Sequence, residues 1–181
     1  MTRDEALAVL KQHLKNKNLI NHSLALEAVL RALARRLGKD EELWGLTGLL
    51  HDIDYEETGG DMDQHTIIGS QILRDLGVDE QIIHATLAHN DKAPRESALD
   101  KAVFAADPLT GLIVAAALIK PEKKLSTIDT DFVLNRFKEK GFARGARRED
   151  IMTCESLGLD LREFVDIGLR AMQGIAGQIG L

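Results

Sequence analysis

The feature that most constrains this chain is the recurrence of apolar residues at helical spacing along most of its length. Between residues 19 and 37 they recur three or four positions apart, at Leu26, Val29, Leu33 and Leu37. A helix with such a stripe must bury it against other elements. No segment shows the strict alternation of a half-buried strand followed by a hairpin turn. The pattern therefore predicts an all-α fold, a single-domain helical bundle.

The same periodicity divides the chain into helices joined by short polar segments. A capping box formed by Thr2 and Glu5 opens the first helix, and Gly38 ends the second. Pro108 predicts a break or bend in the long apolar helix, and residues 54–63 are expected to form an acidic loop. The expected helices cover residues 2–14, 19–37, 41–51, 64–76, 79–90, 97–119, 129–140, 148–157 and 160–179.

The length of 181 residues suits one domain with a substantial core. We expect a single domain over residues 1–181, in which residues 18–117 carry the chemistry and residues 125–181 form a C-terminal helical extension. The last helix of this extension has a broad apolar surface. Packing on the core is the favoured role of that surface, and packing on a second copy, which would give a homodimer, is the alternative.

Charge and composition exclude several functional classes. The net charge of -6 argues against general nucleic-acid binding, which needs clustered Lys and Arg. The longest apolar stretch, residues 109–119, is too short for a membrane span, and the charged N-terminus does not resemble a secretory signal. The single Cys154 cannot form an internal disulfide. We therefore expect a cytoplasmic protein without a membrane anchor.

Four of the six histidines lie where the helical pattern turns side chains inward. They are His22, His51, His65 and His89. Asp52 and Asp107 are also directed inward, and no basic residue between Lys101 and Lys120 can pair with Asp107 locally. A single inward histidine is usually a hydrogen-bonded core residue. Four of them with two buried carboxylates are difficult to satisfy without a common ligand, and a metal ion would serve all six.

The order of these residues resembles a known family. His22, then His51 and Asp52 after a hydrophobic helix, then Asp107, is similar to the H…HD…D signature of HD-domain phosphohydrolases, and Leu-Leu-His-Asp-Ile at residues 49–53 is close to the central motif of that family. His65 and His89 look like the extra histidines of the subgroup that binds two metals. The resemblance covers residues 18–117.

This resemblance implies a set of metal ligands. One ion would be held by His22, His51, Asp52 and Asp107, and the second by His65, His89 and a bridging oxygen of Asp52. Iron or manganese is implied by the resemblance, whereas ligand type alone also accepts zinc, nickel, cobalt or magnesium.

The implied activity is hydrolysis of a phosphate ester or anhydride by a metal-activated water, with Asp52 and His51 at the catalytic centre. The expected partner is a small phosphorylated substrate, with a nucleotide favoured. Many relatives carry a small residue and then Lys or Arg after the His-Asp-Ile segment, where this chain has Asp54 and Tyr55. Lys92 and Arg95 are then the nearest basic candidates for phosphate binding, and Tyr55 is a candidate contact for a base.

Two other interpretations remain open at this point. The first is a mononuclear phosphatase of the same superfamily that acts on nucleoside 5′-monophosphates through His22, His51, Asp52 and Asp107 alone. The second is a regulatory module that binds a nucleotide and keeps the metal for structure. His13 and His84 lie outside the proposed site in every case.

Overall fold

Side-chain caps set the ends of several helices. The Thr2 hydroxyl accepts from the backbone N–H of Glu5, whose carboxylate accepts from the N–H of Thr2, which completes the predicted capping box. Asp40 accepts from the N–H of Leu43 at 3.0 Å. Gly38 takes a left-handed conformation with φ of 63° and ends the second helix, as its position in the sequence predicted.

The computed structural model describes residues 1–181 and contains helices without any strand, which confirms the all-α prediction. The α-helices are α1 (Arg3–His13), α2 (Lys17–Leu37), α3 (Glu41–Leu50), α4 (Tyr55–Thr58), α5 (Ile67–Asp75), α6 (Glu80–His89), α7 (Ala98–Leu118), α8 (Thr130–Lys138), α9 (Arg148–Met152), α10 (Leu161–Gly174) and α11 (Ala176–Ile179). Two short 3-10 helices are η1 (Leu125–Thr127) and η2 (Thr153–Leu157).

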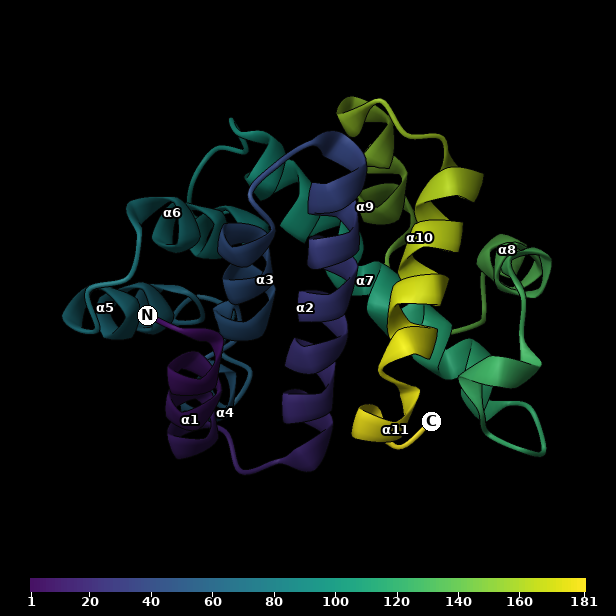
Figure 1. Ribbon diagram of the computed structural model, residues 1–181, viewed down its shortest axis with the longest axis horizontal. Coiled ribbons are helices and arrows are strands. Elements are labelled where there is room, and N and C mark those ends of the chain that lie inside the picture. The colour runs from purple at the N-terminus through teal and green to yellow at the C-terminus, as the bar shows by residue number, and fades with distance from the viewer.

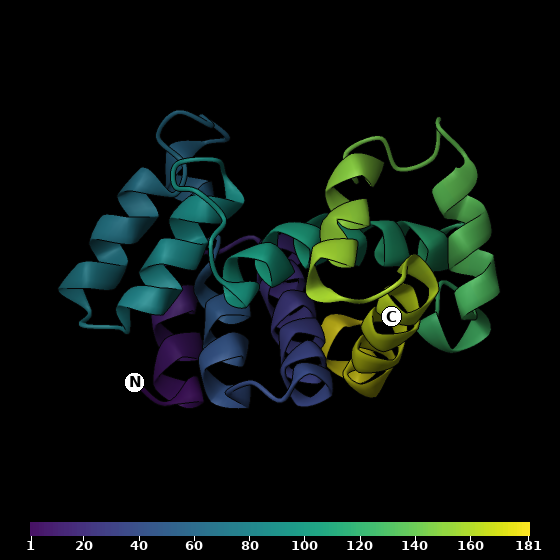
Figure 2. The same cartoon turned by 90° about the horizontal axis from the view of Figure 1, so that it is seen from above.

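Helices α2 and α7 lie at the centre, between two groups of helices (Figure 1). Helices α1, α3, α5 and α6 lie on one side and α8 to α11 on the other, as the second view also shows (Figure 2). The smaller buried apolar cluster is built by α1, α3, α5 and α6, and the larger one joins α2 and α7 to the C-terminal helices. Phe164, Val165 and Met172 of α10 are part of the larger cluster. The C-terminal extension therefore packs on the core, as favoured above.

The structure corrects several details of the predicted helices. The helix expected over residues 148–157 is α9 followed by η2, and the one expected over 160–179 is divided into α10 and α11. Helix α7 runs without interruption through Pro108, so of the predicted break or bend the break is absent, although Pro108 cannot donate a hydrogen bond to the preceding turn. The helix expected from residue 64 begins only at Ile67, because Thr66 has a positive φ of 69°. The acidic loop contains the short helix α4.

Helix α7 has the length and apolar composition of a membrane span, yet it is a core helix here. Leu109, Leu112 and Ile113 are fully buried among neighbouring helices. Its apolar character therefore follows from contact with other helices on several faces.

Helices α2 and α3 meet at a point where only glycine fits. A Cβ atom on Gly48 would lie 2.7 Å from the backbone nitrogen of Glu27 and 2.8 Å from the carbonyl oxygen of Leu26. Backbone atoms cannot yield as the end of a flexible side chain can. This close approach fixes α3 against α2, and with it the two residues that follow α3, His51 and Asp52.

We predict that Gly48→Ala lowers the free energy of unfolding by about 1–3 kcal/mol, because the added methyl group overpacks a backbone contact. Gly111→Ala is the matched control: a Cβ there meets no atom within 4 Å, and replacing a helical glycine should raise stability by about 0.4–1 kcal/mol. Urea unfolding followed by circular dichroism measures both changes. A Gly48→Ala protein as stable as the wild type would contradict this account of the α2–α3 contact.

Candidate metal centre

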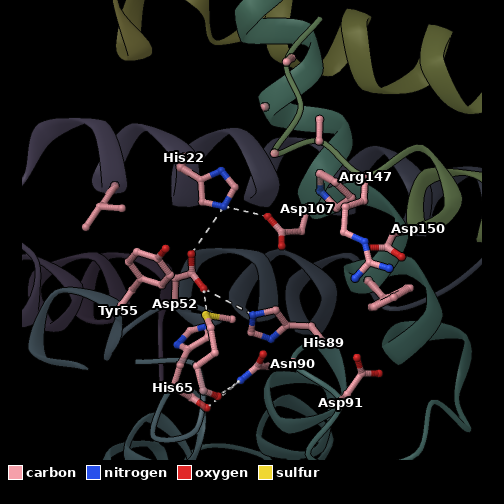
Figure 3. A pocket seen from close by; sticks show the side chains of 18 residues that line it. His22, Asp52, Tyr55, His65, His89, Asn90, Asp91, Asp107, Arg147 and Asp150 are labelled. Carbon is pink, nitrogen blue, oxygen red and sulfur yellow. Dashed lines mark hydrogen bonds and ion pairs between the residues drawn. The ribbon is translucent and has the colours of Figure 1, made fainter. Parts of the chain in front are cut away.

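Six side chains predicted to form the site come from five separate segments and meet in one place, and Figure 3 shows five of them, all except His51. They are His22 in α2, His51 at the end of α3, Asp52 after it, His65 in the turn before α5, His89 at the end of α6 and Asp107 in α7. His65 was expected on a helix and instead occupies the turn before Thr66. The other five lie on, or directly after, the predicted helices.

The carboxylate of Asp52 is the centre of the arrangement, and its two oxygens face different histidines. Asp52 Oδ2 lies 3.3 Å from Nε2 of His51 and 3.6 Å from Nε2 of His22. Asp52 Oδ1 lies 3.3 Å from Nε2 of His65 and 3.4 Å from Nε2 of His89. Asp107 joins the first pair only, with Oδ1 3.0 Å from Nε2 of His22. The geometry thus divides the six residues into two sets that share Asp52.

In three of these imidazoles, a hydrogen bond at Nδ1, the ring nitrogen that faces away from the centre, fixes the orientation of the ring. Nδ1 of His51 lies 2.9 Å from the carbonyl oxygen of Gly48, and Nδ1 of His89 lies 2.6 Å from that of Thr86. Nδ1 of His65 lies 2.9 Å from Oδ1 of Asp54. Because carbonyl and carboxylate oxygens only accept, each Nδ1 carries the proton. Each Nε2 can then offer a lone pair to an ion.

His22 reaches the same state through a hydroxyl group. Its Nδ1 lies 3.1 Å from Oγ1 of Thr110, which donates its own proton to the carbonyl oxygen of Asp107 at 2.8 Å. The hydroxyl must therefore accept from His22 Nδ1. All four histidines thus direct Nε2 inward, the arrangement that outer hydrogen bonds produce around metal-ligating histidines.

Asp54 is a residue of this site that the sequence did not reveal. Its side chain is fully buried, and Oδ2 accepts from the backbone N–H groups of Thr66 and Gly69, both at 2.7 Å. Gly69 is required for this contact, because a Cβ there would lie 3.0 Å from the carboxylate carbon. Asp54 therefore holds the turn that carries His65 and orients its ring. The only signal in the sequence was its place two residues after Asp52.

Asn90 supports the same turn from the end of α6. Its amide donates to the carbonyl oxygens of Met62 and His65 at 2.9 and 3.0 Å. This contact ties the segment before α5 to the residue that follows His89. The two histidines of the second set are therefore held relative to one another.

The residues present fit a divalent metal ion. His51 Nε2 is completely buried and has no hydrogen-bond partner, a costly state for a polar atom. Ligand atoms of His22, His51 and Asp107 lie within 4.8 Å of one another, and so do those of His51, Asp52 and His89. Nitrogen and carboxylate donors without a thiolate suit divalent ions of the first transition series. The cluster can therefore hold a metal.

The electrostatics show strong mutual stabilisation of the charged groups. Burial disfavours the imidazolium of His22, but the hydrogen bond and charge of Asp107, with the charge of Asp52, outweigh it and raise its pKa to about 9. Burial likewise opposes charge on His65, and Asp52 and Asp54 raise its pKa to about 9. Burial would raise the pKa of Asp52, yet the surrounding histidines hold it well below its usual range.

A cavity of about 620 Å³ opens over the centre. His22, Asp52, His65, His89 and Asp107 line one part of it, and Tyr55 stands at its edge with its ring centroid 5.1 Å from that of His65. The opposite wall comes from residues 143–150 of the C-terminal extension. The cavity thus lies between the two groups of helices.

The structure places neither predicted basic residue in this cavity. Nζ of Lys92 lies 3.7 Å from Asp63, at the surface. The guanidinium of Arg95 lies 3.7 Å from the ring centroid of Phe104 and donates to Asp91 at 2.5 Å. Arg95 thus contacts two residues that line the cavity, Asp91 and Phe104, without lining it itself, and Lys92 pairs with a surface carboxylate. Arg147, which the sequence did not single out, lines the cavity instead.

Comparison with known proteins identifies the family. The HD domain family matches residues 19–112, slightly more than half of the chain, and this range contains all six residues of the centre. The chain belongs to the HD-domain family. This assignment confirms the resemblance to the HD-domain family that the sequence suggested.

Several ribonuclease Y proteins are similar to this HD domain. The protein of Oleidesulfovibrio alaskensis is 36% identical over 100 residues, which cover 53% of this chain and 18% of the relative. That of Desulfotalea psychrophila is 31% identical over 140 residues, 74% of this chain and 26% of the relative. The chain therefore spans less than a third of the length of these relatives. No solved structure matches it significantly.

We predict that Asp54→Asn weakens metal binding about 10- to 100-fold, the usual effect of losing an outer partner of a ligand. If the carboxamide oxygen of this variant keeps the two backbone N–H groups, its amide nitrogen faces Nδ1 of His65. That Nδ1 must then accept, which moves the imidazole proton to Nε2 and blocks ligation. Calorimetric titration with manganese measures the affinity. Asp75→Asn, on the exposed end of α5, is the control, and equal affinities for the two variants would contradict the role of Asp54.

Metal binding should also release protons at neutral pH. His22 and His65 have pKa values of about 9 without a metal, so an ion that binds their nitrogens near pH 7.5 must displace protons. Apparent affinity should therefore rise with pH up to about pH 9. Titration of manganese into the chelator-treated protein in weak buffer, with the released acid measured, tests this. Affinity independent of pH between 6.5 and 9 would be the contrary result.

Proposed function

We propose that this HD domain is a phosphohydrolase that uses two divalent metal ions to cleave a phosphate ester or anhydride of a nucleotide. The observation that carries the proposal is the division of Asp52 between two sets of histidines, His22 with His51 and His65 with His89. A carboxylate shared in this way suits a bridge between two ions. In the mononuclear alternative, His65 and His89 would point at Asp52 but would have no metal ion to bind.

Each residue has a definite task in this proposal. Divalent ions at such a centre supply a water that loses its proton near neutral pH and a positive charge for phosphoryl oxygens. His22, His51 and Asp107 would hold one ion, and His65 and His89 the other. Asp52 offers one oxygen to each set, which fixes the spacing of the two positions. Asp54, Thr110 and the carbonyl groups of Gly48 and Thr86 keep the imidazole protons away from the centre.

The choice of a small nucleotide substrate rests on charge and size. The similar proteins are ribonucleases by name, which favours a substrate with a ribonucleoside phosphate. The cavity of about 620 Å³ suits a small-molecule ligand. Its lining includes four carboxylates against one guanidinium, and the whole chain has a net charge of -6. A long polyanion would gain little from this surface. We therefore propose a mononucleotide or very short oligonucleotide as substrate.

Asp52→Ala tests the proposal directly. We predict that it removes both bound metal and turnover while the helical circular dichroism signal stays close to that of the wild type, because the side chain faces a cavity instead of the apolar core. Elemental analysis and a panel of phosphate esters and nucleotides, assayed with manganese, iron, cobalt and nickel, provide the two readouts. Asp75→Ala, an exposed carboxylate in α5, is the control and should change neither.

The possible outcomes separate the alternatives. Full activity in the Asp52→Ala protein would overturn the proposed chemistry. One metal per chain at full occupancy, unaffected by His65→Ala, would favour the mononuclear enzyme. Nucleotide binding without turnover in every metal-loaded form would favour the regulatory module.

A further inference from the structure

The cavity has one cationic side chain that the proposed centre does not use. Arg147 is the only lysine or arginine among the residues that line it. It comes from the C-terminal extension, outside the residues that match the HD domain family. Figure 3 shows Arg147 beside Asp150, on the side of the cavity away from Asp52 and Tyr55. A cation is therefore displayed across the cavity from the metal centre.

The contacts of Arg147 leave its terminal amino groups available. Its side chain makes one hydrogen bond, from Nε to Oε1 of Glu149 at 3.1 Å, and Nε also lies 3.4 Å from Oδ2 of Asp150. The two terminal nitrogens, which form the planar fork suited to phosphate oxygens, donate no hydrogen bond within the chain. Lys92 and Arg95, by contrast, do not line the cavity: Lys92 pairs with Asp63 at the surface, and Arg95 is held by Asp91.

The segment that carries Arg147 is built around the adjacent arginine. The five N–H groups of the Arg148 guanidinium lie within hydrogen-bond distance of six backbone carbonyl groups, which holds residues 136–146 in a compact turn. The acceptors are the carbonyl oxygens of Arg136, Phe137, Glu139, Phe142, Ala143 and Ala146. Ala143 is kept at a positive φ of 44°, a conformation unfavourable for a residue with a side chain. Such a scaffold fixes where the backbone of Arg147 stands.

We infer that Arg147 is an anion-binding residue that holds a second phosphate of the substrate, separate from the phosphoryl group at the metal centre. This inference rests on the proposed function and narrows the substrate to nucleotides with two phosphate groups apart from one another, such as bisphosphorylated nucleosides or dinucleotides. The metal centre on one wall and Arg147 on the other would each hold one phosphate. Tyr55 lines the cavity on the side of the metal centre and offers aromatic surface to the nucleoside.

The test compares two probes that differ by one phosphate. Equilibrium dialysis of the manganese-loaded full chain gives dissociation constants for adenosine 5′-monophosphate and adenosine 3′,5′-bisphosphate, with the intact nucleotide quantified. The wild type should bind the bisphosphate more tightly. Arg147→Gln should reduce this preference by roughly tenfold or more, since a charge-assisted hydrogen bond pair is lost. Arg144→Gln is the matched control, because Arg144 lies in the same segment, is exposed and does not line the cavity.

Three results would overturn the inference: a wild type without preference for the bisphosphate, an Arg147→Gln protein that keeps the preference, or an equal effect of Arg144→Gln, which would indicate general surface charge. A failure of the proposed function would be detected by a different measurement, that of turnover. It would appear as turnover that survives Asp52→Ala, whereas the binding preference and its dependence on Arg147 do not require turnover.

Discussion

The burial of one carboxylate, that of Asp52, constrains much of this protein. A carboxylate removed from water is destabilised unless positive charge or donors surround it. Here four imidazoles approach its two oxygens at 3.3 to 3.6 Å. Without an ion, the neighbouring carboxylates raise the pKa values of His22 and His65, so these two imidazoles stay protonated and supply the positive charge. With an ion, the same lone pairs become ligands. A metal ion that bound here would therefore replace protons on the histidines.

The rest of the fold keeps these groups in register. The close backbone contact at Gly48 fixes α3 against α2, so His51 and Asp52 stand at a constant position relative to His22. Asp54 and Asn90 hold the turn with His65 against the end of α6. Helix α7 supplies Asp107 and Thr110 and at the same time forms the centre of the larger apolar cluster. Core packing and the metal centre thus depend on the same two helices, α2 and α7.

The C-terminal extension changes the site as well as completing the core. Helix α10 buries Phe164 and Met172 in the larger apolar cluster. The preceding segment, organised by Arg148, closes the cavity on the side opposite Asp52. Residues that match the family provide the proposed centre for chemistry, and residues outside the match provide the far wall. Selectivity between substrates is therefore expected to depend on the extension more than on the centre.

The sequence alone determined the helical class, the order of the helices and the six residues that meet at the centre. Helical periodicity predicts which way a side chain faces, and His22, His51, Asp52 and Asp107 follow one another in the order of the H…HD…D signature.

Partners that come from different segments could not be found in this way. Asp54 bonds His65 across a turn whose backbone departs from the predicted helix at Thr66, so periodicity misplaced that turn. Arg147 lines the cavity from a segment that Arg148 organises through backbone carbonyl groups. Lys92 and Arg95, nearer in sequence to His89, do not line it, because Lys92 pairs with Asp63 and Arg95 is held by Asp91 and Phe104. Only tertiary structure decides such contacts, because they depend on distances between segments that no local pattern encodes.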